Sequence, residues 1–333
     1  MQKFLIIQTA FIGDVVLATS LVEKLHQFFP GAAIDFLVRK GNESLLSNNP
    51  NLRDVLIWDK KKNKNKNLLA LLKKIRASKY DKVINLQRYL ATGILTAFSG
   101  ATETIGFDKN PLSFLFSKKI QHSFNISEAK HEIDKNNALI SHFTNTVAAR
   151  PVLYPSVADV DSIKPYTTSP FVTMTPSSVW FTKKYPVEKW IDLINKFDPS
   201  YTIYLLGGKD NADECNQIAE KAINKNSRVL AGKLSFLQSA ALMKHAAMNF
   251  VNDSGPMHFA SAVNAPVTAI FCSTIPAFGY TPLSDVSYIV ETKELLTCRP
   301  CGLHGKKACP LGHFKCGFGI ETEQILDTFV NKP

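Results

Sequence analysis

The chain has 333 residues, of which 45% are hydrophobic and 20% charged, an ordinary composition for a globular α/β protein with room for two domains. No apolar stretch is long enough to span a bilayer, and the N-terminus shows no signal-peptide pattern, so we expect a cytoplasmic protein. Six cysteines in such a chain predict reduced thiols, because disulfide scaffolds belong to short secreted chains.

The formal net charge of +11 is concentrated in the first half. Residues 1–160 hold 22 Lys and Arg against 13 Asp and Glu, whereas the remainder holds 17 against 15. The run Lys60–Lys66 supplies part of the excess, although such a run is usually a solvated loop. A basic half favours an anionic partner. The basic residues are not interleaved with aromatics as in nucleic-acid-binding modules, so a phosphorylated lipid is favoured over nucleic acid.

The first half alternates strand-like and helix-like segments. Predicted strands cover residues 4–8, 34–38, 55–58 and 83–86, and predicted helices cover 14–29 and 68–77. This alternation predicts a parallel sheet with helices on both faces. The stretch from Pro151 to Pro170 is rich in proline and small polar residues, so we place a linker there and end the first domain at residue 160.

The second half repeats the alternation. Predicted strands cover residues 171–175, 202–206, 229–230, 249–251, 267–271 and 288–290, and predicted helices cover 187–197, 212–223, 234–246 and 257–263. The predicted fold class is therefore α/β, with two doubly wound, Rossmann-like domains facing across a cleft. Ligands bind such sheets at the carboxyl ends of the strands.

The first post-strand turn contains Gly13 and Asp14 but lacks the glycines of a Rossmann turn and the Gly-Lys-Ser/Thr of a P-loop. Asp14 reads either as a helix cap or as a catalyst, because a carboxylate at a helix N-terminus is biased toward the ionised form that a general base needs.

Three later loops offer groups for a diphosphate or a ribose. The loop at 175–190 supplies Ser177, Ser178 and Lys183, and the turn at 206–210 supplies two glycines and Asp210. The segment Asn252–His258 places small residues and Gly255 at a helix N-terminus. The free backbone N–H groups of such a turn can bind an anion, and we call it an anion seat. Ordinary helix capping explains the segment equally well.

Four cysteines near the C-terminus are spaced Cys298-x2-Cys301-x7-Cys309-x6-Cys316. Their second half lacks the Cys-x2-Cys pair of common zinc sites, so free thiols are favoured over a metal and no metal site is predicted.

Together these segments resemble the ADP-heptose:lipopolysaccharide heptosyltransferases, glycosyltransferase family nine. The resemblance rests on four motifs in order: Ile12-Gly-Asp-Val-Val-Leu-Ala18; Asp81-Lys-Val-Ile-Asn-Leu-Gln87 followed by Ile105-Gly-Phe107; Lys183-Lys-Tyr-Pro-x3-Trp190; and Asn252-Asp-Ser-Gly-Pro-Met-His258 followed by Pro266 and the loop from Phe271 to Pro276. The cysteine-rich tail resembles the second-heptose branch of the family.

The resemblance implies a GT-B architecture with an acceptor domain at residues 1–160, a nucleotide-sugar domain at 161–318, and a C-terminal segment at 319–333 whose helix packs back on the first domain. It implies an inverting, metal-independent transfer, without a cofactor, from ADP-L-glycero-β-D-manno-heptose to the lipopolysaccharide inner core. It also gives the site residues their roles. The catalytic residues are Asp14, the general base, and Lys183, which contacts the phosphates; donor-binding residues are Ser177, Ser178, Asp210, Asp253, Ser254, Gly255, Met257 and His258; acceptor-side residues are Gly13, Arg39 and Arg88.

An inner-core acceptor is anionic and lies on the inner membrane, so we expect peripheral docking on its cytoplasmic face through Lys60–Lys66, Arg39 and Arg88, without insertion. Two alternatives stay open. One is a nucleotide-sugar epimerase of the same fold, and the other is a non-catalytic protein that binds a membrane or a partner.

Overall fold

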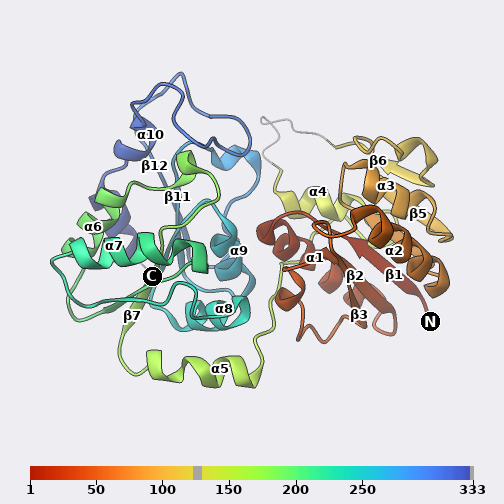
Figure 1. Cartoon of the computed structure of the whole chain (residues 1–333), viewed down its shortest axis with the longest axis horizontal. Helices are drawn as coiled ribbons and strands as arrows, with labels where there is room; N and C mark the ends of the chain where they lie inside the picture. The colour runs from red at the N-terminus through yellow and green to blue at the C-terminus, as the bar shows by residue number, and fades with distance from the viewer. Residues whose placement is uncertain (123–129, 331–333) are drawn as a thin grey trace. The chain divides into compact units, whose positions relative to one another are not determined.

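The computed structural model describes residues 1–122 and 130–330 and divides into two compact units, Met1–Tyr154 and Pro155–Pro333 (Figure 1). The division falls inside the proline-rich stretch in which we expected a linker. The last three residues of the predicted C-terminal segment lie outside the described residues. Among the helices described, none is both long and apolar enough to cross a bilayer.

The first unit contains a fully parallel sheet in the order β3-β2-β1-β4-β5-β6. In chain order its elements are β1 (Lys3–Ile7), α1 (Ile12–Phe28), β2 (Ala33–Arg39), η1 (Glu43–Leu45), β3 (Asp54–Trp58), α2 (Lys64–Ser78), β4 (Lys82–Asn85), α3 (Leu90–Ala97), β5 (Glu103–Phe107), η2 (Ser113–Leu115), β6 (Lys118–Ile120) and α4 (Glu132–Ala138).

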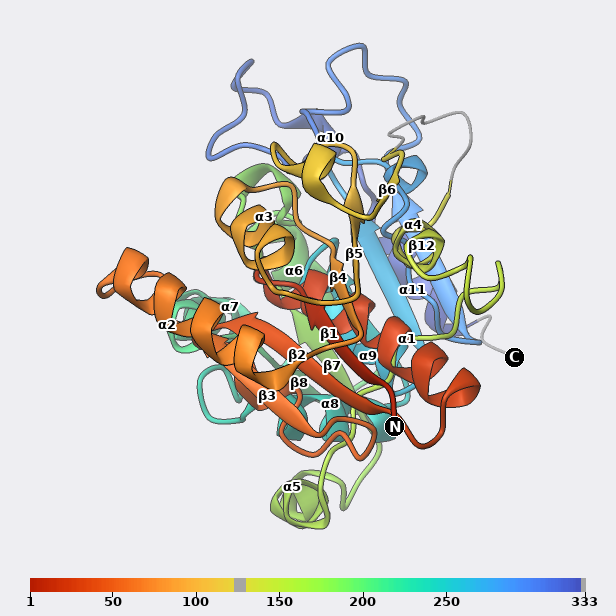
Figure 2. The ribbon, with the colours of Figure 1, turned by 90° about the vertical axis from the view of Figure 1, so that its right-hand side faces the viewer.

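Helices cover both faces of this sheet, as Figure 2 shows for α1 on one side and for α2 and α3 on the other. Leu68, Leu71 and Ile75 of α2 and Leu95 of α3 pack in one cluster with apolar residues of β1 to β4. Helix α1 buries its own stripe and contacts α4. The strands are apolar on both faces, as a doubly covered parallel sheet requires.

The second unit repeats this topology, with the parallel strand order β12-β11-β10-β7-β8-β9. In chain order its elements are α5 (Val157–Ile163), η4 (Lys164–Tyr166), β7 (Phe171–Thr175), η5 (Phe181–Lys183), α6 (Val187–Lys196), β8 (Thr202–Leu205), η6 (Lys209–Asn211), α7 (Ala212–Lys221), β9 (Ser227–Val229), α8 (Phe236–His245), β10 (Asn249–Asn252), α9 (Gly255–Ala262), β11 (Val267–Phe271), η7 (Pro276–Phe278), β12 (Ser287–Glu291), α10 (Lys315–Phe318) and α11 (Thr322–Val330).

Every strand and helix predicted from the sequence is present, most of them with ends shifted by a few residues, and the fold class is confirmed. The prediction lacked α3, α4, α5, α10, β5 and β6. Helix α5 lies in the expected linker, where a capping box between Ser156 and Asp159 starts a helix too short to show periodicity. We expected the run Lys60–Lys66 to be a loop. Helix α2 begins at Lys64, so the last residues of this run form the first turn of the helix.

The C-terminal helix has its main contacts in the second unit, and the expectation that it also packs back on the first domain stays a prediction. Helix α11 contacts α6 and β12 of the second unit. Its Ile325 is fully buried in that unit's core, and Lys189 and Lys196 of α6 pair with Glu321 and Glu323 at 2.8 and 2.7 Å. The amphipathic face of the helix is therefore used on its own domain.

Candidate active site

Each sheet reverses its strand order once, between β1 and β4 in the first unit and between β7 and β10 in the second. Ligands of doubly wound sheets bind at the carboxyl side of such reversal points. The loops after these four strands and the opening turns of the helices that follow them contain most of the predicted site residues. In the first unit these are Gly13, Asp14 and Arg88; in the second they are Ser177, Ser178, Lys183, Asp253, Ser254, Gly255, Met257 and His258.

In the first unit, Asp14 lies in the opening turn of α1, where its Oδ2 accepts the backbone N–H of Phe11 at 3.1 Å. Buried side chains hold the preceding turn: Gln8 Oε1 accepts the N–H of Ala10 at 3.2 Å, and Asn42 Nδ2 donates to the Ala10 carbonyl at 3.0 Å. Asp14 is thus a capping residue, as the simpler interpretation held, and its half-buried carboxylate lies at the reversal point.

Cations gather beside this turn. Arg39 ends β2 and lies over the Phe11 ring at 5.1 Å. Lys60 donates to the carbonyl and hydroxyl of Thr9 at 2.8 and 3.0 Å and lies over the Trp58 ring at 4.8 Å. Burial, with the nearby charges of Arg39 and Lys64, lowers the pKa of Lys60 to about 8. Lys60 is therefore a fixed, half-buried cation, unlike its exposed neighbours Lys61 and Lys62.

In the second unit, Lys183 Nζ lies 2.7 Å from Asp253 Oδ2. The two side chains come from the loops after β7 and β10 and are 15% and 8% exposed. An unpaired carboxylate beside a helix N-terminus would repel a phosphate. The ion pair offsets that charge and fixes the lysine ammonium next to α9. The structure therefore brings together two residues that the sequence separates by seventy positions.

Asn252, which is not among the predicted site residues, fixes this loop arrangement. Its fully buried side chain accepts the N–H of Tyr185 at 2.9 Å and donates to the carbonyl of Pro176 at 2.6 Å. It thereby holds both ends of the loop that carries Ser177, Ser178 and Lys183. Its position at the end of a strand, directly before Asp253, was the available signal.

Helix α9 opens with the predicted anion seat. Ser254 is its N-cap and makes no side-chain capping bond, and Gly255 is the first helical residue. Two predicted donor residues lie in the first turn of α9: Met257 is fully buried, and His258 is 4% exposed with its ring centroid 6.4 Å from that of Tyr280. Their role in donor binding stays a prediction.

Thr274 and Arg299 stabilise the position of Asp253, Thr274 by a direct hydrogen bond and Arg299 by binding the loop that carries Thr274. Thr274 Oγ1 donates to Asp253 Oδ2 at 2.5 Å. Arg299 donates to the backbone carbonyls of Cys272 and Thr274, both at 2.7 Å, and pairs with Glu291 at 2.6 Å. Thr274 belongs to the loop after Phe271 that the family resemblance includes, whereas no sequence signal marked Arg299.

Removing the Thr274 hydroxyl tests this support. Thr274→Val should lower kcat/KM for the nucleotide-sugar donor that the resemblance implies by about tenfold, because the Asp253 carboxylate loses a hydrogen bond. Thr268→Val on the same strand-to-loop segment is the control, since its buried hydroxyl bonds Thr328 at 2.6 Å. Steady-state kinetics and thermal melting separate the two. Equal activity losses in both variants would contradict a positioning role for Thr274.

The remaining donor residue, Asp210, is exposed in η6, in the loop after β8. Its strand is the neighbour of β7, so the loop lies on the carboxyl side of the same sheet. Within the described part of the chain, Asp210 forms no hydrogen bond or ion pair with Lys183 or Asp253.

The four C-terminal cysteines are free thiols. Cys298 Sγ lies 3.9 Å from His313 Nε2. For Cys309, burial acts to raise the pKa of the thiol, but hydrogen bonds from backbone N–H groups, including that of Phe314, lower it overall. No group of three or more His, Cys, Asp or Glu in residues 1–122 and 130–330 is arranged to hold a metal ion. The cysteine segment instead contacts the loop that carries Lys183, because Thr182 exchanges two hydrogen bonds with Lys306 at 3.1 and 2.8 Å.

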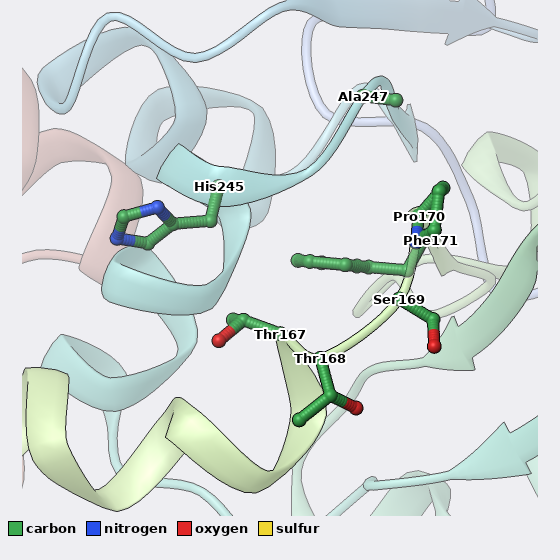
Figure 3. A pocket seen from close by; sticks show the side chains of 7 residues that line it. All are labelled: Thr167, Thr168, Ser169, Pro170, Phe171, His245 and Ala247. Atoms are coloured by element: carbon green, nitrogen blue, oxygen red, sulfur yellow. The ribbon is translucent and has the colours of Figure 1, made fainter.

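An open cavity of about 500 Å³ lies elsewhere in the second unit (Figure 3). Its lining includes Phe171, at the start of β7, and His245 and Ala247, which precede β10. This is the amino end of the sheet, opposite to the edge where Lys183 lies, so we assign the cavity no part in the candidate site.

Two doubly wound parallel sheets, with polar side chains at both reversal points, have the arrangement of the GT-B fold class. The model of glycosyltransferase family 9 (heptosyltransferase) matches residues 68–309, and the chain belongs to this family.

The relatives are distant but cover the chain well. Lipopolysaccharide heptosyltransferase 3 of Escherichia coli is 26% identical over 79% of this chain and 82% of its own length. Lipopolysaccharide heptosyltransferase 1 of Pseudomonas aeruginosa is 22% identical over 98% and 93%. The solved structure of a family 9 glycosyltransferase from Veillonella parvula is 21% identical, covers 98% of this chain and 96% of its own, and has a TM-score of 0.85. That of E. coli ADP-heptose lps heptosyltransferase II is 20% identical, covers 99% and 98%, and has a TM-score of 0.80.

Proposed function

We propose that this glycosyltransferase transfers L-glycero-D-manno-heptose from ADP-L-glycero-β-D-manno-heptose to the lipopolysaccharide inner core with inversion, on the cytoplasmic face of the inner membrane. The relatives named as heptosyltransferases types 1 and 3 support the sugar and the acceptor class. The observation that carries the proposal is the Lys183–Asp253 ion pair beside the α9 N-terminus, because it presents a fixed cation where a diphosphate leaving group needs one.

The donor half of the reaction uses the second unit. As the bond between the anomeric carbon and the diphosphate oxygen breaks, the electron pair leaves with ADP, and negative charge develops on the phosphate. Lys183 and the N–H groups of the α9 opening turn stabilise that charge, with hydroxyls of Ser177 and Ser178 on the same loop. These groups supply the positive charge themselves, so we propose a metal-independent reaction without a cofactor.

The acceptor half uses the first unit. The acceptor oxygen attacks the anomeric carbon from the face opposite ADP and loses its proton to the Asp14 carboxylate. Arg39 is the last residue of β2, and Lys60 and Arg88 lie in the loops after β3 and β4. All three therefore lie on the carboxyl side of this sheet and match an acceptor that carries carboxylates and phosphates.

The test is mass spectrometry of inner-core acceptors of defined length incubated with the enzyme and ADP-heptose, with ADP release followed in parallel. A mass increase of one heptose on one acceptor is the expected result. Turnover of the nucleotide sugar without acceptor would support an epimerase, and donor binding without turnover would support a non-catalytic protein. Activity that survives chelation is expected for metal-independent transfer.

The pH dependence of acceptor use tests the role of Lys60. Its ammonium is present below pH 8 and is lost as the pH rises through its pKa of about 8, so KM for an anionic acceptor should rise above that pH. Lys60→Gln should show a high KM that lacks this rise. Lys61→Gln, at an exposed neighbour, should behave like the wild type. A KM rise that persists in Lys60→Gln would assign the effect to another group.

A further inference from the structure

Helix α3 distributes its polar and apolar side chains in an unusual way. Its buried face includes Thr92 and Thr96, whose hydroxyls donate to backbone carbonyls three and four residues earlier, at 2.9 and 2.8 Å. Its outward stripe is apolar: Leu90, Ile94 and Phe98 follow at four-residue spacing, with Leu90 53% and Phe98 48% exposed. A surface helix normally turns its apolar stripe inward, so this outward stripe needs a partner other than water.

The short helix η2 contacts α3 and adds to this face. It exposes Phe114 at 71% and Leu115 at 46%. Asn110 joins the two segments, because its Nδ2 donates to two carbonyls of the loop before α3, at 2.9 and 3.1 Å. Gly93 permits this approach, since a Cβ there would collide with the Asn110 side chain. We call the following residues the apolar patch: Tyr89, Leu90, Ile94, Phe98, Phe114 and Leu115.

Basic side chains lie next to the apolar patch. Arg76 donates to the carbonyl of Phe98 at 3.0 Å, Arg88 precedes Tyr89, and the exposed Lys118 and Lys119 follow η2 in β6. Exposed aromatic and aliphatic side chains with a cationic rim match the chemistry of an anionic membrane surface, with apolar groups for the interface and cations for the headgroups.

We propose that the apolar patch and its basic rim bind the surface of an anionic lipid bilayer, with Leu90, Phe114 and Leu115 entering the interface. This deepens the proposed function, on which it rests, because a lipid-linked acceptor requires the enzyme to work at a membrane. It differs from docking through Lys60–Lys66 alone, since apolar contact survives salt whereas attraction between exposed charges is screened.

Co-sedimentation with phosphatidylethanolamine and phosphatidylglycerol vesicles tests the proposal. Phe114→Ser/Leu115→Ser should weaken binding by about tenfold or more at both low and high salt, because two apolar side chains no longer leave water. Lys118→Gln/Lys119→Gln should weaken it by about fivefold for each lysine, at low salt only. Leu69→Ser/Ile223→Ser is the control, because these residues, 59% and 82% exposed, lie outside the patch. Unchanged binding by the Phe114 and Leu115 variant would overturn the proposal.

A second measurement identifies what covers the patch. Phe114→Trp should be shielded from an aqueous quencher when vesicles are added, whereas Ile223→Trp should not. Shielding without vesicles, together with a higher oligomeric state by ultracentrifugation, would show contact between copies of the chain and overturn lipid binding. With a water-soluble core acceptor, Phe114→Ser/Leu115→Ser should keep the wild-type rate. If the wild type itself transfers no heptose, the proposed function fails, and the vesicle assay still tests the patch.

Discussion

Replacing Asp14 by Asn should lower kcat by about 10² or more, because the amide cannot accept the proton of the attacking hydroxyl. The amide oxygen still accepts the N–H of Phe11, so the capping bond of α1 and the folded structure should persist. Single-turnover kinetics with saturating donor and acceptor measure the effect, and circular dichroism checks the fold. A kcat within a few fold of the wild type would remove Asp14 from the role of general base.

The chain contains a matched control for this substitution. Asp159 is the third residue of α5, as Asp14 is of α1. Its Oδ2 accepts the backbone N–H of the N-cap residue Ser156 at 2.8 Å. Asp159→Asn should change the melting temperature about as much as Asp14→Asn and leave kcat unchanged. The comparison separates a loss of catalysis from a loss of helix capping.

Replacing Lys183 by Ala should lower kcat/KM for the donor by about 10² to 10³, since it removes a preorganised cation from the leaving group and leaves Asp253 as an unpaired buried carboxylate. The KM for the acceptor should change much less. Affinity for ADP, measured by calorimetry, should also fall, because the diphosphate is common to donor and product.

Lys184 provides the control for Lys183. It is the next residue, but its Nζ pairs with Glu214 at 2.8 Å, and both side chains are about one quarter exposed. Lys184→Ala should cost about 1 kcal/mol of stability or less and keep kcat/KM within about twofold. Similar activity losses in the two variants would show that the loop needs positive charge in general and would contradict a specific role for Lys183.

The basic first half is best understood by treating its lysines separately. Lys60 is held against Thr9 and belongs with the turn that carries Asp14, whereas Lys61 and Lys62 are exposed. Lys64 and Lys66 lie in the first turn of α2. A single run in the sequence therefore combines a candidate acceptor contact with solvent-exposed charge, and only Lys60 is expected to affect the acceptor KM.

The sequence by itself determined the alternation of strands and helices, and with it the two parallel sheets. It also placed Asp14, Lys183 and Asp253 in loops after strands, because periodicity and turn residues report the local backbone. The order of the strands in the sheet decided which of these loops lie side by side. Since β10 lies beside β7, Asp253 meets Lys183, and Thr274 and Arg299 can support them from a third loop and a fourth segment.

The local sequence pattern also could not predict which face of α3 packs against the sheet. Its apolar composition shows no preference for one face until packing turns Leu95 and two threonines inward, against the sheet, and leaves Leu90 and Phe98 outside. The tertiary structure also determines that α11 packs in the second domain, because α6 and β12 cover its apolar stripe. Local sequence fixes which backbone a segment adopts, whereas contacts between distant segments depend on the sheet order and packing that fold them together.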